Sequence, residues 1–191
     1  VWIGHQSGYI DVYDSKKSTW KYITDIALSG RTIRSVNSLH RSGDKLYIGT
    51  SFGITVFSIS KFEFSDTYTS FGNAMQPNVS SVSLFNNRVF AATNSGIVSS
   101  KPGATNLAAP ESWEILSPIV TGNNLLPFNG EIFASTASGL LKFQNNSWSI
   151  VNGIISNVKI LSALDTSLLF VDGNAIKSLN INSVSSTLYA S

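Results

Sequence analysis

The sequence predicts an all-β protein built from repeated antiparallel sheets of four strands, which is the architecture of a β-propeller. A sequence motif of two predicted strands joined by a tight turn with a glycine occurs four times, and the chain shows no helical periodicity. The glycines that close these turns are 45, 43 and 43 residues apart. A period of this length with several short strands is typical of propeller blades. The four glycines are Gly8, Gly53, Gly96 and Gly139.

The second repeat shows the strands of one blade most clearly. We expect an inner strand over 33–40 and a hairpin turn at 42–44. Residues 45–50 (KLYIGT) are nearly continuous in apolar character, as expected for a strand covered on both faces. Residues 54–59 form the third predicted strand, and 64–68 form a more polar outer strand with an aromatic residue.

The later repeats follow the same order. An Asp-Gly pair between two apolar runs at 172–173 predicts a two-residue hairpin in a weaker fifth repeat. The approximate repeat units are 1–31, 32–78, 79–118, 119–156 and 157–191, within a single propeller segment. The strands predicted after the second unit are 79–85, 88–93, 97–100, 113–116, 147–151, 158–164, 168–171, 175–179 and 187–189.

Small residues recur at one position of the second strand of each repeat. They are Gly4, Gly49, Ala92 and Ser135, and we expect neighbouring blades to approach closely there. The turn glycines should have positive φ, which glycine adopts without a side-chain penalty. Each outer strand carries an aromatic residue, namely Trp20, Tyr68, Trp113 and Trp148.

The number of blades bears on whether the ring closes. The chain begins inside a second strand, so the first unit lacks its innermost strand and the total is about five blades. We expect an open arc that is part of a larger ring of about six to eight blades. A compact ring of five blades is the alternative.

Composition excludes several classes of protein. Charged residues make up 13% of the 191 residues, about half of the average share. A net charge of +2 gives no reason to expect a nucleic-acid partner. The chain contains no cysteine, which excludes disulfides and thiolate chemistry. No run of 18 apolar residues occurs, so we expect no transmembrane segment.

Particular stretches of the chain resemble known propeller sequences. The segment LYIGTSFGITVFSI resembles the propeller repeat of two-component regulators. The most specific segments are 52–72 (FGITVFSISKFEFSDTYTSFG) and 89–113, where AATNSGI is followed by an insertion that leads to a tryptophan. With these segments, residues 1–148, about three quarters of the chain, resemble the first propeller of PorZ-like proteins, surface components of the type IX secretion system of Bacteroidetes-related bacteria.

The resemblance implies a protein of the periplasm or of the outer-membrane surface, secreted with a signal peptide that this segment does not contain. It implies protein partners in a secretion and sortase complex, with anionic lipopolysaccharide or an oligosaccharide as a further ligand. The leading hypothesis is therefore a non-catalytic binding and scaffold module. The alternative is the periplasmic ligand-sensing propeller of a hybrid two-component regulator.

No constellation of catalytic or metal-binding residues is evident. The two histidines, His5 and His40, have no spacing that brings them together with a carboxylate, and we expect no metal and no cofactor. The sequence shows no nucleophile elbow and no phosphate-binding glycine motif. A polysaccharide lyase or glycosidase would need converging carboxylates, whereas the acids lie in scattered turns, so this class ranks last.

One rim of the predicted propeller is a candidate binding surface. Turns between second and third strands should lie on the same rim as the connections between blades. An arginine and aromatic residues there would suit a peptide or an anionic glycan. This candidate rim consists of His5, Gln6, Arg31, Phe52 and Asn94, together with the long connector 70–78.

Overall fold

The structure is a computed structural model that describes residues 1–75, 77–117, 122–151, 154–155, 157–164, 166–180 and 185–190. These residues form one three-stranded sheet, four four-stranded sheets and one short hairpin, all antiparallel. Strand order within each sheet follows the sequence, so every sheet is a simple meander. The structure therefore confirms an all-β fold of about five antiparallel blades.

The sheets are named first to fifth in chain order. The first contains β1 (Trp2–Gly4), β2 (Ile10–Asp14) and β3 (Thr19–Ile23). The second contains β4 (Val36–Ser42), β5 (Lys45–Thr50), β6 (Gly53–Ser58) and β7 (Glu63–Tyr68). The third contains β10 (Val79–Phe85), β11 (Arg88–Thr93), β12 (Gly96–Ser100) and β13 (Trp113–Ser117). The fourth contains β14 (Gly122–Phe128), β15 (Glu131–Thr136), β16 (Gly139–Gln144) and β17 (Ser147–Ile150). The fifth contains β18 (Val158–Leu164), β19 (Ser167–Asp172), β20 (Ala175–Asn180) and β21 (Ser185–Ala190).

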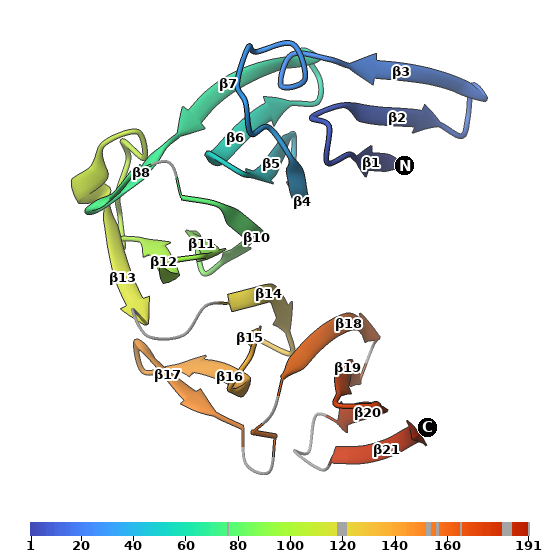
Figure 1. The fold of residues 1–191 in the computed structure, drawn as a ribbon, viewed down its shortest axis with the longest axis vertical. Coiled ribbons are helices and arrows are strands. Elements are labelled where there is room, and N and C mark those ends of the chain that lie inside the picture. Colours follow the sequence, from blue (N-terminus) through green and yellow to red (C-terminus); the bar gives the residue numbers. More distant parts are fainter. Residues whose placement is uncertain are drawn as a thin grey trace.

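The five sheets follow one another around an arc (Figure 1), with β4, β10, β14 and β18 on its inner side. The first and fifth sheets stand at the two ends of the arc, on its open side. As predicted, the first sheet lacks an innermost strand, and β1 takes the position that β5 has in the second sheet. The close approach predicted at Gly4 is also present, because a Cβ atom there would lie 2.3 Å from Cγ1 of Val36.

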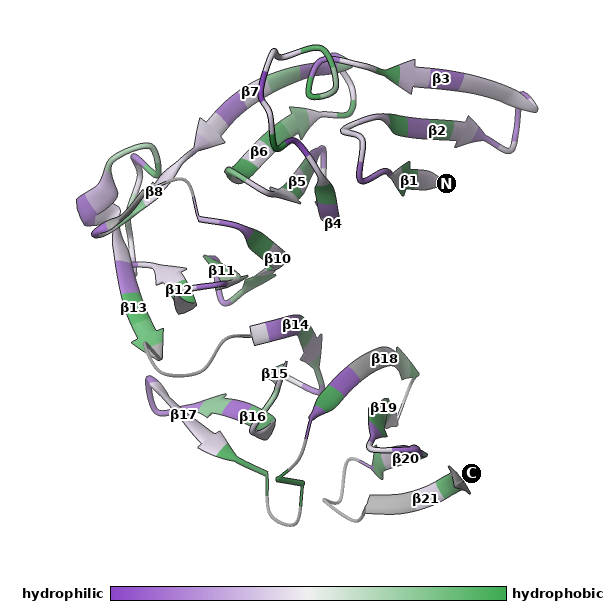
Figure 2. Cartoon of the chain, viewed as in Figure 1, coloured by the Kyte–Doolittle hydropathy of each residue, from purple (hydrophilic) through white to green (hydrophobic). Residues whose placement is uncertain are grey.

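The hydrophobic core is divided into clusters that lie between neighbouring sheets. Among the described residues, one cluster joins each successive pair: first with second, second with third, third with fourth, and fourth with fifth. Figure 2 accordingly shows hydrophobic residues distributed over all five sheets instead of gathered on one side of the arc. Stacking of flat faces therefore holds this fold together.

Hydrogen bonds along the inner strands reinforce the stacking. The Ser38 hydroxyl in β4 accepts a hydrogen bond from the Val82 N–H in β10 at 3.1 Å. One repeat later, the Ser81 hydroxyl accepts from the Leu125 N–H in β14 at 3.0 Å. Each serine follows a bulge in its strand, which turns the hydroxyl out of its own ladder and toward the next sheet.

A threonine fastens the turn between second and third strands in the three middle sheets. In the third sheet, the Thr93 hydroxyl donates to the Gly96 carbonyl at 2.7 Å and accepts from the Ser95 N–H at 3.0 Å. Thr50 and Thr136 make the same pair of bonds. Gly96 has the predicted positive φ, at 121°.

Two connections carry structure that the sequence did not predict. The connector 70–78 contains a hairpin of β8 (Ser70–Phe71) and β9 (Ala74–Met75). The insertion before β13 contains the 3₁₀ helix η1 (Pro110–Ser112), whose Pro110 carbonyl accepts from the Gly72 N–H at 3.0 Å. The first predicted strand of the second sheet begins three residues later than expected, at Val36. In the part of the chain that the structure describes, no helix is long and apolar enough to cross a membrane.

Candidate functional site

Backbone hydrogen bonds join the turns of the candidate rim to the connections between blades. The turns between second and third strands bond to the connections between blades: the Val36 N–H donates to the His5 carbonyl, and the Ser51 N–H donates to the Ser35 carbonyl, at 3.0 and 3.1 Å. The Asn94 N–H donates to the Asn78 carbonyl at 3.2 Å. The turns and connectors therefore share one rim, and its shape depends on how the sheets are stacked.

His5 and Gln6 lie in the first turn of this rim. His5 Nε2 is 3.0 Å from Asp11 Oδ2, and the two side chains are 40% and 26% exposed. His5 occupies the position that a threonine has in the middle sheets, so a histidine–carboxylate pair replaces the threonine bonds there. Gln6 is exposed to solvent.

Arg31 and Phe52 make direct contact. The guanidinium carbon of Arg31 lies 4.2 Å from the centre of the Phe52 ring, a cation–π geometry. Phe52 itself is 6% exposed and packs in the cluster between the first and second sheets. Arg31 therefore covers the ring, and the charge rather than the aromatic face is presented on the rim.

Asn94 is exposed and lies in the third sheet's turn, away from the Arg31–Phe52 pair in sequence and in blade. In the connector 70–78, Phe71 holds the chain against the third sheet. Its side chain is fully buried, and its ring centre lies 4.4 Å from that of Trp113. Of the five predicted side chains, the structure thus brings Arg31 and Phe52 into contact, while His5 is paired with Asp11.

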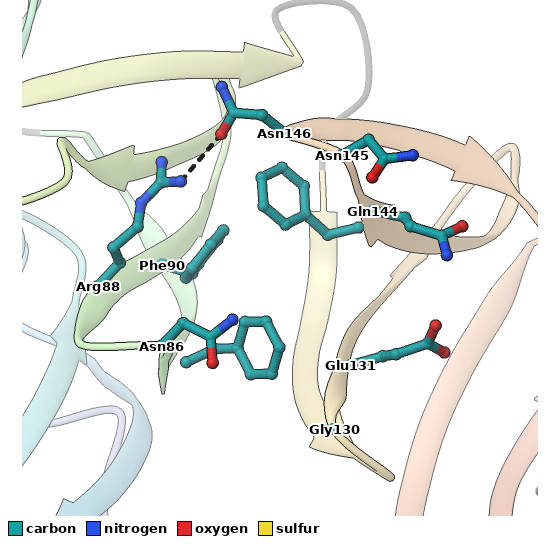
Figure 3. A pocket seen from close by; sticks show the side chains of 10 residues that line it. Asn86, Arg88, Phe90, Gly130, Glu131, Gln144, Asn145 and Asn146 are labelled. Atoms are coloured by element: carbon teal, nitrogen blue, oxygen red, sulfur yellow. Dashed lines mark hydrogen bonds between the residues drawn. The ribbon is translucent and has the colours of Figure 1, made fainter.

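The opposite rim has a groove of about 410 Å³ between the third and fourth sheets. Figure 3 shows side chains from both sheets around it, with Asn146 reaching across toward Arg88. A volume above about 300 Å³ lies in the range of small-ligand pockets. The lining residues are Phe85, Asn86, Arg88, Phe90, Gly130, Glu131, Phe143, Gln144, Asn145 and Asn146.

Arg88 organises this groove. Its Nε donates to the Ser100 carbonyl at 2.8 Å and one terminal nitrogen donates to Asn146 Oδ1 at 3.0 Å, across the boundary between the two sheets. The other terminal nitrogen bonds to Ser99 Oγ and forms an ion pair with Glu114. Four of the five guanidinium N–H groups therefore have acceptors within the protein, and through them this arginine joins two blades.

A smaller groove of about 380 Å³ lies between the outer strands of the first and second sheets. Tyr22, Phe62 and Phe64 line it together with Asp25 and Glu63. The ammonium group of Lys21 lies 4.5 Å from the centre of the Phe62 ring. A lysine of the protein therefore already contacts one of the aromatic rings that line this groove.

Several carboxylates stabilise turns or form ion pairs. Asp44 accepts from the Ser58 hydroxyl at 3.0 Å and from the Ser60 N–H and hydroxyl at 2.8 Å each, and the Ser60 hydroxyl is the main cause that lowers the pKa of Asp44. Within this part of the chain, no three histidine or acidic side chains gather as a metal site would require.

Sequence reasoning did not find the groove on the opposite rim. Its turns were visible as Asn-Asn at 86–87 and 145–146 and Asn-Gly at 129–130, because asparagine tolerates the left-handed backbone of tight hairpins. The space between the turns depends on the stacking of two sheets, which no local pattern specifies.

These features define a β-propeller fold whose blades carry polar turns on both rims. The sequence profile of the family described as "TSS9, PorZ, N-terminal beta-propeller domain" matches residues 1–114. The chain belongs to this PorZ N-terminal β-propeller family. No curated protein matches the sequence.

Solved structures of propellers superimpose on nearly the whole chain. PorZ, an essential bacterial surface component of the type-IX secretion system of Porphyromonas gingivalis, has a TM-score of 0.78 and 20% identity over 99% of this chain and 25% of its own. The extracellular domain assigned to the hybrid two component system BT3049 of B. thetaiotaomicron has a TM-score of 0.73 and 16% identity over 100% of this chain and 27% of its own.

The chain thus spans about a quarter of the length of these two structures. The Neurospora crassa Pan2 WD40 domain also superimposes, with a TM-score of 0.68 and 11% identity over 99% of this chain and 62% of its own. Identities this low establish a shared propeller fold, and propellers of one shape host unrelated functions.

Proposed function

We propose that this chain is a non-catalytic binding and scaffold propeller of a bacterial envelope protein, a component of a type IX secretion system. The observation that carries the proposal is the family match over residues 1–114. In this role the propeller works at the periplasmic or outer-membrane surface with a sortase complex and contacts anionic lipopolysaccharide. The chain is one segment of a larger ring, whose further blades cover the exposed face of the first sheet.

The candidate rim is the surface we assign to an anionic partner. Arg31 lies on this rim with its guanidinium held over Phe52, and an arginine fixed in this way needs to lose little side-chain entropy on binding carboxylate or phosphate. Residues 1–61 carry eight lysines and arginines against four acids. This excess of positive charge favours an anionic ligand on the first two sheets.

A second candidate function is ligand sensing by a hybrid two-component regulator. It is supported by the superposition of the whole chain on the extracellular domain of BT3049. The two functions differ in the membrane that the protein meets. A secretion component works at the outer membrane, whereas a sensor is joined to the inner membrane.

Affinity purification of the intact protein from its own bacterium, after cross-linking and separation of the two membranes, distinguishes these functions. We expect recovery with the outer membrane, with secretion-system proteins and a sortase as the main cross-linked partners. Recovery with the inner membrane and a histidine kinase would establish the sensor instead. Recovery from the cytoplasm would contradict both.

The rim is tested by replacing its arginine. Arg31→Gln should weaken retention of the intact protein on purified anionic lipopolysaccharide by about tenfold or less, since a single charge near the surface contributes about 1 kcal/mol. Lys101→Gln is the control for loss of one positive charge, because Lys101 is exposed and lies in the insertion on the opposite rim, whereas Arg31 is half-buried. Equal effects of the two changes would show non-specific charge attraction and would exclude this rim.

A further inference from the structure

The groove between the third and fourth sheets has a wall of phenyl rings. The ring centre of Phe90 lies 5.2 Å from that of Phe143 and 6.4 Å from that of Phe85, with the rings edge to face. Phe90 is fully buried, while Phe85 and Phe143 are partly exposed toward the groove. A ligand in this groove therefore meets an apolar surface that is held rigid from behind.

Carboxamides surround this apolar wall. Asn86, Gln144 and Asn145 are exposed and come from two different hairpins (Figure 3). Within the described part of the chain, no hydrogen bond occupies their side chains, whereas Asn146 is bound to Arg88. Each amide offers two donors and an acceptor. The backbones of Asn86 and Asn145 are fixed in the left-handed region, at φ 48° and 52°, so their side chains project from rigid turns.

The charges in the groove are neutralised by the protein. The positive charge of Arg88 is paired with the carboxylate of Glu114. Glu131 is 3.0 Å from Lys142, and in Figure 3 its carboxylate points away from Arg88. The groove therefore presents no unpaired charge that would attract an ionic ligand, which distinguishes it from the rim that carries Arg31.

We propose that this groove is a binding site for a neutral saccharide. Paired donors and acceptors of the carboxamides match the hydroxyls of a sugar, and the apolar C–H face of a pyranose ring packs against phenyl rings. An extended peptide fits less well, because such peptides usually add to a free strand edge. The lining strands here are already paired, with Phe90 opposite Ser83 and Ser99, and Phe143 opposite Ile132 and Trp148.

The turns provide a matched pair of double variants. Asn86→Gly with Asn145→Gly removes two carboxamides from the groove, and glycine keeps the left-handed backbone at both positions. Asn87→Gly with Asn129→Gly makes the same chemical change at φ 58° and 50° in residues that do not line the groove. Any effect of glycine on folding is therefore common to both variants.

The probe is a microarray of neutral and acidic oligosaccharides together with random decapeptides, followed by calorimetry with the neutral oligosaccharide that binds best. We expect the intact protein and the Asn87/Asn129 variant to bind neutral oligosaccharides equally, and the Asn86/Asn145 variant to bind at least tenfold more weakly. Binding to acidic oligosaccharides or peptides alone, no binding at all, or equal binding by both double variants would overturn the proposal. None of these results bears on the secretion function, which depends on cross-linked partners.

Discussion

The first and second sheets carry the same pattern of residues in two different environments. Leu46 and Ile48 of β5 are 2% and 0% exposed, because the first sheet covers them. Ile3 of β1 and Val1, which precedes β1, occupy the equivalent positions of the first sheet and are 41% and 71% exposed. Trp20 in the outer strand of the first sheet is likewise 48% exposed. Strand register makes Phe64, and not Tyr68 as the sequence suggested, its equivalent in the second sheet, and Phe64 packs against the cluster between the two sheets.

This difference shows what the repeat encodes. Each repeat specifies a sheet with two apolar faces, and burial depends on whether a neighbour stacks on each face. Full burial of an isoleucine or valine contributes about 1.5–3 kcal/mol. The second sheet receives this contribution on both faces, because the first and third sheets cover it. The first sheet receives it only on the face toward the second sheet.

The largest test of the comparison is truncation at the two equivalent isoleucines. Ile48→Ala should lower the free energy of unfolding by about 2–5 kcal/mol, because it leaves a cavity between two sheets. Ile3→Ala should cost about 1 kcal/mol or less, since the side chain is already exposed. Urea unfolding followed by tryptophan fluorescence measures both. Equal losses would mean that the far face of the first sheet is covered.

Arg88 tests whether the contact between the third and fourth sheets depends on a polar joint as well as on stacking. Arg88→Gln should cost about 1–3 kcal/mol, because Glu114 and Asn146 lose a partner in a largely buried site. Lys142→Gln breaks a more exposed ion pair in the same region and should cost about 1 kcal/mol or less. If both variants unfold at the same urea concentration, Arg88 is not the joint between these blades.

The threonine turns allow a smaller comparison of middle and terminal sheets. Thr93→Val removes the hydroxyl that bonds both Gly96 and Ser95, and it should cost about 1 kcal/mol. His5→Val at the equivalent turn of the first sheet removes only a partly exposed pair and should cost less. Amide hydrogen exchange of each turn provides the readout. If His5→Val increased the exchange rate of its turn, relative to the wild type, more than Thr93→Val did, this order would be contradicted.

The smallest expected effect is a pH dependence of stability. It arises from β4, the inner strand of the second sheet, which has no equivalent in the first sheet. His40 in β4 accepts a hydrogen bond from the Leu84 N–H at 3.3 Å, and burial lowers its pKa below the usual value. The unfolded chain therefore binds more protons than the folded one. Stability from this group is complete above about pH 6.5 and is lost as the pH falls toward the folded pKa.

Urea unfolding at pH 7.5 and 5.5 measures this effect against His40→Asn. The wild type should lose more stability between the two pH values than the variant. An identical loss would show that His40 stays neutral or stays solvated in both states.

Prediction from sequence succeeded where local rules act and failed where distant segments meet. Strands such as 79–85 and 158–164 were predicted to the residue, because alternation and turn residues are local signals. The hairpin β8–β9 and the helix η1 were missed, since they depend on contacts between the connector and the insertion. The sequence predicted that turns and connections between blades lie on one rim. It did not predict that Phe52 is buried under Arg31, because burial depends on the neighbouring sheet.

Pulsed electron paramagnetic resonance tests most directly whether the sheets form an open arc. Because the chain has no cysteine, spin labels can be attached at Thr19→Cys in β3 and Thr187→Cys in β21, with Thr19→Cys and Glu63→Cys as the reference pair on neighbouring outer strands. In an open arc, the distance between the first and last sheets exceeds that of the reference pair. Equal distances would mean that the five sheets close into a ring, and the open face of the first sheet would not exist.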